Sequence, residues 1–536
     1  MQFSDIFAFR VTERVRWRAA PTRLPQEGQP TTVLSGLLPS QLRSVATTLG
    51  LATLLIRLPN FGNPTYHVDE AFYLLVGQSL VDGATLYVDV WDRKPAGLFL
   101  LYALMAKLGG VLIYQAIAGL FAWATALTIA QIVRTFAGST AAVASGIVYL
   151  AMLSALAGGG GQSPVFYNLF VAVAALLVLR QTIGRAGEIE SWGGQIAMLL
   201  CGIALTIKPT VLPEGVFLGL MLLATCRRAH RSVGRLWTYA AQLGAAALAP
   251  SVLIIAYFFA AGQLDAYWYA TTQSIFLTEP PAPRASAVRL AWLAHIIWVP
   301  AVIGIGGIAL STLRAASEGG RSRPIAIFIA GWLMASTAGF LMVPNFYDHY
   351  ALPLAVTLAI ACAPVFDRRR SGVVTAAFVT IHLLLVSGFP FDQLARKAAA
   401  QDSLTRANTI IARHINGGCL FVFDATPALY RPFDRCLGTR FAFPEHLSNQ
   451  REARAIGADP VYELGSVLRR SPSVIALPKS PSVSTPNLLT WQRLRQHLAV
   501  RYRNVGTATL VDVVGSQQVE IWALGLDHRP IAASLP

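Results

Sequence analysis

A run of polar residues follows the first long apolar segment of this 536-residue chain. It reads HVDEAFYLLVGQSLVDGATLYVDVWDRKPAGLF and covers residues 67–99, in a chain of which only 13% of the residues are charged. A carboxylate can accept a proton from an attacking hydroxyl group, and a cation nearby can stabilise a departing phosphate. The side chains of this run that could perform such chemistry are Asp69, Glu70, Arg93 and Lys94.

Both pairs also have a purely structural explanation. Asp69 and Glu70 open a helix-like run, AFYLLVGQSLVDG, and the helix dipole favours acidic side chains in a first turn. Arg93 and Lys94 precede another apolar stretch, where long basic side chains extend to the level of the lipid headgroups. A clamp on a lipid phosphate would stand at the same depth, so the residue types alone leave both interpretations open.

Two later turns carry comparable groups. The turn IKPT contains Lys208, which could also be a basic side chain at the headgroup level. The turn NFYDHY contains Tyr347, Asp348, His349 and Tyr350. An aromatic belt at the membrane surface accounts for the tyrosines alone, but histidine and tyrosine can both donate a hydrogen bond to a phosphate.

A third loop, residues 262–289, contains the aromatic triplet Tyr267, Trp268 and Tyr269. These rings could stack on a sugar. Such a triplet more often anchors a protein at the membrane surface, and we favour the anchor.

The composition indicates the class of protein. Hydrophobic residues make up 54% of the chain, whereas an average soluble protein is about 25% charged. A membrane protein with many spans is therefore expected. The net charge of +16 is assigned to membrane topology and not to nucleic acid, because no basic patch is interleaved with stacking aromatic residues in a soluble segment.

Eleven apolar segments are long enough to cross a bilayer, and one or two more crossings would give 12 or 13. The segments are residues 41–58, 111–133, 140–157, 164–180, 193–207, 210–226, 236–261, 290–313, 324–343, 350–366 and 372–391.

Arginine-rich loops predict the orientation, because such loops stay in the cytoplasm. The N-terminal arm, residues 1–39, is basic without an apolar core, which predicts a cytoplasmic arm and not a cleavable signal. Arginines also cluster within residues 227–235, 314–323 and 368–370. If all these segments are cytoplasmic, the remaining connections lie on the outer side of the membrane. These are the first loop 59–110, the turns 158–164, 207–210 and 345–350, loop 262–289, and residues 392–536.

The stretch PAGLFLLYALMAKLGG, residues 95–110, is treated differently. If it crossed the membrane, every later loop would change sides and the arginine clusters would be exported. We therefore predict a helix that lies at the outer surface or enters the bilayer only partway.

Residues 392–536 predict a small α/β domain. GGCLFVFD, VIALP, TATLVDVV and QVEIWAL are typical of strands, and a helix is expected near 490–499. Cys419 and Cys436 are the two cysteines of this domain, and an oxidising compartment would allow a disulfide, although two unpaired small side chains are the alternative. Cys201, Cys226 and Cys362 lie in or beside spans, where packing is the usual role.

Four motifs, in order, resemble the GT-C fold glycosyltransferases that use polyprenyl-phosphate sugars. They are similar to bacterial protein O-mannosyltransferases and aminoarabinose lipid A transferases. HVDEAFY resembles the acidic motif of these enzymes, and WDRKPAGLFLLYAL resembles the segment that leads into a membrane-entering helix. ALTIKPTVLP and NFYDHYALPLAV resemble the middle and late motifs.

The resemblance implies an inverting transfer of a sugar from a polyprenyl phosphate to a glycan, lipid or protein of the cell envelope, at the outer face of a bacterial inner membrane. Asp69 would be the base, with Glu70 in support. The expected ligands of the donor phosphate are Arg93, Lys94, Lys208, His349 and Tyr350, and the expected substrate contacts are Tyr267, Trp268 and Tyr347.

No cofactor is required by this scheme. Some members of the fold use a divalent cation, for which the available ligands would be His67, Asp69, Glu70 and His349. A transporter or lipid flippase is the main alternative function, but it is expected to bury charge near mid-membrane and to show repeated halves. A non-catalytic scaffold would not explain the polar first loop.

Overall fold

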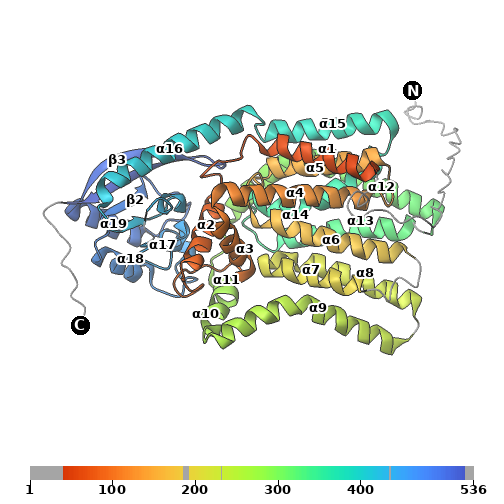
Figure 1. Cartoon of the computed structure of the whole chain (residues 1–536), viewed down its shortest axis with the longest axis horizontal. Helices are drawn as coiled ribbons and strands as arrows, with labels where there is room; N and C mark the ends of the chain where they lie inside the picture. The colour runs from red at the N-terminus through yellow and green to blue at the C-terminus, as the bar shows by residue number, and fades with distance from the viewer. Residues whose placement is uncertain (1–39, 185–191, 231, 321, 434–435, 526–536) are drawn as a thin grey trace, which may run out of the picture. The chain divides into compact units, whose positions relative to one another are not determined.

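The computed structural model describes residues 40–536 except 185–191, 231, 321, 434–435 and 526–536. The predicted cytoplasmic arm, residues 1–39, lies outside the described residues. Residues 45–536 form one compact unit, in which the long helices of the membrane part run alongside one another and α2, α3, α10 and α11 lie at one end of them (Figure 1).

The described helices of the membrane part are numbered in chain order. They are α1 (Ser40–Arg57), α2 (Val68–Val81), α3 (Ala96–Leu108), α4 (Val111–Val133), α5 (Ser139–Ala155), α6 (Ser163–Ile183), α7 (Gly193–Ile207), α8 (Leu212–Ala229), α9 (Val233–Ala260), α10 (Leu264–Trp268), α11 (Ser274–Leu277), α12 (Pro283–Glu318), α13 (Ser322–Leu341), α14 (Leu352–Phe366) and α15 (Arg369–Val386).

The chain is a multi-pass membrane protein. Within the described residues, eight helices are long and apolar enough to cross a membrane. The other predicted spans coincide with α1 and with the shorter apolar helices α5 and α7. The exact number of crossings stays a prediction.

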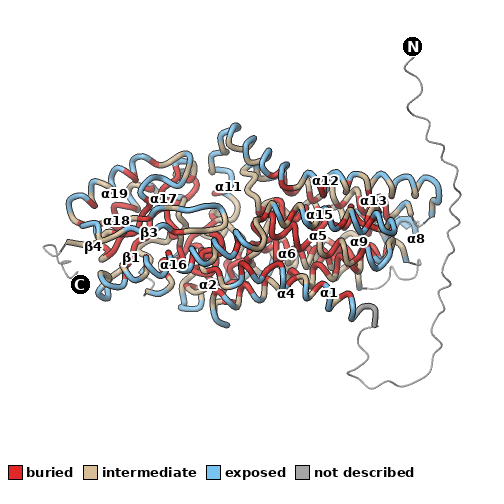
Figure 2. The backbone as a smooth tube through the Cα atoms, turned by 90° about the horizontal axis from the view of Figure 1, so that it is seen from above, coloured by how far each residue is buried: buried red, intermediate tan, exposed pale blue. Residues whose placement is uncertain are grey.

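Burial differs sharply between these helices. In an apolar 18-residue window of the segment Asp348–Phe366, 89% of the residues are buried, whereas in such a window of Val233–Ala260 only 11% are buried. Figure 2 shows buried residues around α5 and α6 and more exposed ones along α12. A helix that is apolar all round and largely unburied by protein faces lipid, so α9 and α12 form part of the lipid-facing surface.

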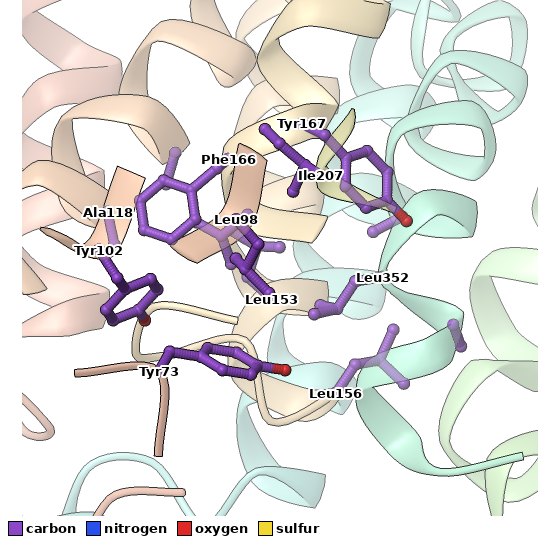
Figure 3. Packing of buried hydrophobic residues seen from close by; sticks show 14 of the residues in the cluster. Tyr73, Leu98, Tyr102, Ala118, Leu153, Leu156, Phe166, Tyr167, Ile207 and Leu352 are labelled. Atoms are coloured by element: carbon purple, nitrogen blue, oxygen red, sulfur yellow. The ribbon is translucent and has the colours of Figure 1, made fainter. Parts of the chain in front are cut away.

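Helices α2 and α3 are packed tightly against the spans. A Cβ atom on Gly77 of α2 would lie 2.6 Å from the Tyr102 carbonyl carbon of α3, and one on Gly97 would lie 2.6 Å from the Thr206 carbonyl oxygen of α7. Only glycine permits backbones to approach so closely. Figure 3 shows side chains of these helices among those of the spans, with Tyr73, Leu98 and Tyr102 beside Phe166 and Leu352. The first loop is therefore part of the core.

The C-terminal part contains one four-stranded sheet. Its strands are β1 (Leu420–Val422), β2 (Val474–Pro478), β3 (Tyr502–Val511) and β4 (Ser516–Leu524). Their order is β1-β2-β4-β3, with β1 and β2 parallel and the other pairs antiparallel. Its helices are α16 (Phe391–Ile415), α17 (Pro444–Ser448), α18 (Pro460–Arg469) and α19 (Leu488–Arg501).

All four strands overlap the predicted ones, although β3 begins five residues before the predicted TATLVDVV and ends three residues before its end, and α19 includes the predicted helix. The structure joins Cys419 and Cys436 in a disulfide, with Cα atoms 5.2 Å apart. Cys201, Cys226 and Cys362 are free and buried.

We predict that both ends of α3 face the same side of the membrane. Thirteen helical residues span about 20 Å, which is less than the roughly 30 Å hydrocarbon core. Single cysteines at the exposed positions Val88 and Lys107 should both react with an impermeant maleimide added from outside. Because the free native cysteines are buried, the background should be low. Labelling at position 107 only after permeabilisation would show that α3 crosses.

Candidate active site

Asp69 lies at the centre of a cluster of polar side chains. His67 caps α2, since its Nδ1 atom accepts a hydrogen bond from the Asp69 N–H group (3.1 Å). Lys94 Nζ lies 3.7 Å from Asp69 Oδ1, and His349 Nε2 lies 3.4 Å from Asp69 Oδ2. Only 8% of Asp69 is exposed. One carboxylate therefore meets an amine and two imidazoles from three segments of the chain.

Lys94 is held in place from several sides. Asp92 Oδ1 accepts a hydrogen bond from the Lys94 N–H group (2.8 Å), and Asp92 Oδ2 lies 3.3 Å from Nζ. The amine also stands over the rings of Phe443 and Tyr73, 4.9 and 5.3 Å from their centroids. Burial lowers the pKa of Lys94, but Asp92 and Asp69 outweigh it and raise the pKa above its ordinary value. Lys94 is therefore a fixed cation at neutral pH.

Lys208 approaches the cluster from the turn between α7 and α8. Its amine stands 4.2 Å from the centroid of the Tyr350 ring. Burial lowers the pKa of Lys208 to about 8, while Asp69 raises it and Lys94 lowers it further. The ring of Tyr347 stacks on that of His349, with the centroids 5.9 Å apart. The expected phosphate ligands Lys94, Lys208, His349 and Tyr350 thus lie together around Asp69.

Glu70 points away from this cluster, because consecutive residues of a helix project about 100° apart. Its side chain is fully buried against Gly160. Burial raises the pKa of its carboxyl to about 8, although the Gly161 N–H group and the Tyr114 hydroxyl lower it. The sequence groups Glu70 with Asp69 as one site. The structure corrects this grouping, since Glu70 faces the glycine turn.

Arg93 is engaged by a distant residue of the C-terminal part. Its guanidinium forms two bonds with the Glu452 carboxylate, one of them 3.1 Å long. The neighbouring Trp91 N–H group donates to the Arg440 carbonyl (2.9 Å). Arg93 is expected from the sequence to bind a donor phosphate, but the structure pairs it with a carboxylate. No local pattern marks Glu452, because its partner lies 359 residues earlier.

The same C-terminal segment brings His446 to the buried carboxylate of Asp92. His446 Nε2 lies 3.6 Å from Asp92 Oδ2, and its ring packs edge-on against Trp91. Burial lowers the pKa of His446 to about 3; Asp92 raises it, and Arg93 and Lys94 lower it further. The imidazole is therefore neutral, and it packs beside the residue that holds Lys94.

The aromatic loop lies apart from the cluster. Tyr267 stacks on Phe258 with centroids 4.8 Å apart and meets Tyr87 edge-on. Trp268 is 49% exposed. Tyr267 thus packs on the end of α9, and of the three expected substrate contacts only Tyr347 touches a residue of the Asp69 cluster.

Three of the four candidate metal ligands lie together. The donor atoms of His67, Asp69 and His349 are all within 4.8 Å of one another. Two imidazoles and a carboxylate suit a transition metal such as zinc or iron. Glu70 does not belong to this group among the described residues.

Comparisons with known proteins identify the fold. No family model and no curated protein matches the chain. Among solved structures, ArnT from Cupriavidus metallidurans in the apo state is similar, with a TM-score of 0.60 and 12% identity over 90% of this chain and 98% of that chain. ArnT from the same organism bound to undecaprenyl phosphate is also similar. Its TM-score is 0.59 and its sequence identity 14%, over 89% of this chain and 98% of that chain. These likenesses confirm the predicted GT-C fold.

We predict that Glu70 makes stability fall as the pH rises. Its carboxyl has a pKa of about 8 in the folded chain against 4.5 ordinarily, so its stabilising contribution is complete below pH 4.5 and is lost as the pH rises through 8. Between pH 6 and 9 the loss is about 2–3 kcal/mol. Glu70→Gln, which stays neutral, should abolish this dependence in thermal unfolding curves. Parallel curves for both proteins would contradict the assignment.

We predict that Glu452 holds the polar loop in place. Charged hydrogen bonds contribute about 1.5–3 kcal/mol each, so Glu452→Gln should raise hydrogen exchange in residues 84–95 about tenfold or more. Glu520→Gln is the matched control, because Glu520 forms a similar ion pair with Arg495 on the sheet. Equal exchange of residues 84–95 in the two variants would rule out this role.

Proposed function

We propose that this protein is an inverting glycosyltransferase that moves a sugar from a polyprenyl phosphate to a hydroxyl group of a cell-envelope acceptor. The observation that carries the proposal is the carboxylate of Asp69, which faces Lys94 and His349 at the end of spanning helices. Support comes from the fold shared with ArnT, an aminoarabinose lipid A transferase solved with undecaprenyl phosphate.

The reaction would proceed in one displacement. The acceptor oxygen attacks the anomeric carbon of the sugar while Asp69 takes its proton. The bond between that carbon and the phosphate oxygen breaks on the opposite face, which inverts the configuration. The electron pair remains on the phosphate oxygen, where Lys94 and Lys208 stabilise the added negative charge. His349 donates a further hydrogen bond to the phosphate.

The remaining residues position these groups. Tyr350 supports Lys208 through its ring, and Tyr347 supports His349. Arg93, engaged by Glu452, holds the loop that carries Lys94. Tyr347 also contacts Arg289, whose guanidinium carbon lies 4.2 Å from its ring centroid.

A divalent cation fits beside the same groups. His67, Asp69 and His349 would hold it, and it would supply positive charge to the leaving phosphate. The displacement proposed above does not require it, because Lys94 and Lys208 already supply that charge.

We predict that Asp69→Asn lowers turnover at least about a hundredfold, since the amide cannot accept the proton. Transfer of radiolabelled sugar from a polyprenyl-phosphate sugar to a cell-envelope extract would measure it. Asp265→Asn, the same change at an exposed residue of the short helix α10, should leave turnover unchanged. A chelator should also leave turnover of the wild type unchanged. Full turnover of the Asp69→Asn variant would show that Asp69 is not the base. Loss of wild-type turnover on adding the chelator would show that the reaction needs a metal ion.

A further inference from the structure

A cavity of about 380 Å³ lies apart from the Asp69 cluster. It is found where the end of α2, the junction of α3 and α4, α16 and the turn Pro427–Tyr430 meet. Cavities of this size hold small ligands or headgroups. Its polar lining includes Gln78, which follows Asp69 by nine residues on α2 and so lies about 13 Å farther along the helix.

Arg431 brings a positive charge to this cavity. Burial lowers the pKa of its guanidinium, and the Tyr114 hydroxyl raises it. In the part of the chain that the structure describes, no carboxylate forms an ion pair with Arg431. A partly buried cation without a counter-charge is costly. The planar guanidinium suits the oxygens of a phosphate or carboxylate.

Two amide oxygens in the same lining also have no partner. Gln78 Oε1 and Asn408 Oδ1 are buried and accept no hydrogen bond from the described residues. An unsatisfied buried acceptor costs about 1–3 kcal/mol. A ligand with an anionic group for Arg431 suits this cavity, and hydroxyl or amine hydrogens on the same ligand would suit the amide groups of Gln78 and Asn408.

The surroundings of the cavity indicate where such a ligand comes from. Gly109, Gly110 and Val111 line it at the point where the spanning helix α4 begins. A Cβ atom on Gly110 would meet nothing within 4 Å. The large side chains of Leu104, Leu108 and Leu112 on α3 and α4 are more than half exposed. Exposed leucines beside the start of a span are typical of a surface in contact with acyl chains.

We propose that this cavity binds the headgroup of an anionic phospholipid, with its phosphate on Arg431 and its hydroxyl hydrogens on Gln78 and Asn408. The acyl chains would run along the exposed leucines. The proposal goes beyond the sugar transfer and does not depend on it, because no member of the Asp69 cluster lines the cavity.

Lipid binding to the purified full chain tests the proposal. We expect short-chain phosphatidylglycerol to bind more tightly than phosphatidylcholine of the same chain length, and Arg431→Gln to weaken its binding at least about tenfold. Arg406→Gln is the control. It removes one positive charge from the exposed face of α16, where Arg406 pairs with Asp402, and should leave binding unchanged.

A second variant tests the space instead of the charge. Ala106→Phe fills the cavity from α3 and keeps Arg431, so it should also lose phosphatidylglycerol, while its unfolding temperature reports on folding. Inorganic phosphate distinguishes an ion site from a lipid site. Binding of inorganic phosphate without the lipid, or equal weakening in the two arginine variants, would overturn the proposal.

Discussion

An ionised carboxylate beside a bilayer persists only where cations and hydrogen-bond donors are held next to it. The cluster around Asp69 has this composition, and much of the surrounding structure holds its members in place. Lys94 supplies the charge, Asp92 fixes Lys94, and His446 packs beside Asp92. The tight packing of α2 and α3 against the spans holds Asp69, which lies on α2, and Lys94, which precedes α3, at a fixed distance from each other. In this polar loop Asp69, Asp92, Arg93 and Lys94 each have a partner of opposite charge, which stabilises them in an apolar chain.

The two carboxylates of the acidic motif show how one helix can serve two environments. Asp69 faces Lys94 and His349, whereas the adjacent Glu70 faces a glycine turn in which burial favours the neutral acid. Adjacent residues of a helix point in different directions. Asp69 therefore faces the polar cluster, while Glu70, one position later, packs in the protein interior. The two carboxyl groups therefore differ in their surroundings, although they are chemically alike and adjacent in the sequence.

The apolar segments and the strands could be predicted from the sequence because their signals are local. Each predicted span coincides with a helix, and VIALP forms a strand where expected. Lys94, Lys208 and His349 could be grouped because each follows or precedes a span at the same face. The ion pair of Arg93 with Glu452 could not, because nothing near either residue indicates a partner several hundred positions away. Helix geometry alone predicts that the side chains of Asp69 and Glu70 point in different directions. The cavity beside Arg431 could not be predicted from the sequence, because four separate segments come together to form it.

The pairing of Arg93 with Glu452 also sets an order of events during biosynthesis. The two residues are 359 positions apart, and ribosomes add about 5–20 residues per second. Glu452 is therefore synthesised roughly 20–70 s after the polar loop that it contacts. Throughout that interval the first spans are already made, yet the loop between them is unfinished. The membrane part of the chain therefore gains this ion pair only after the C-terminal part has been translated and has folded against it.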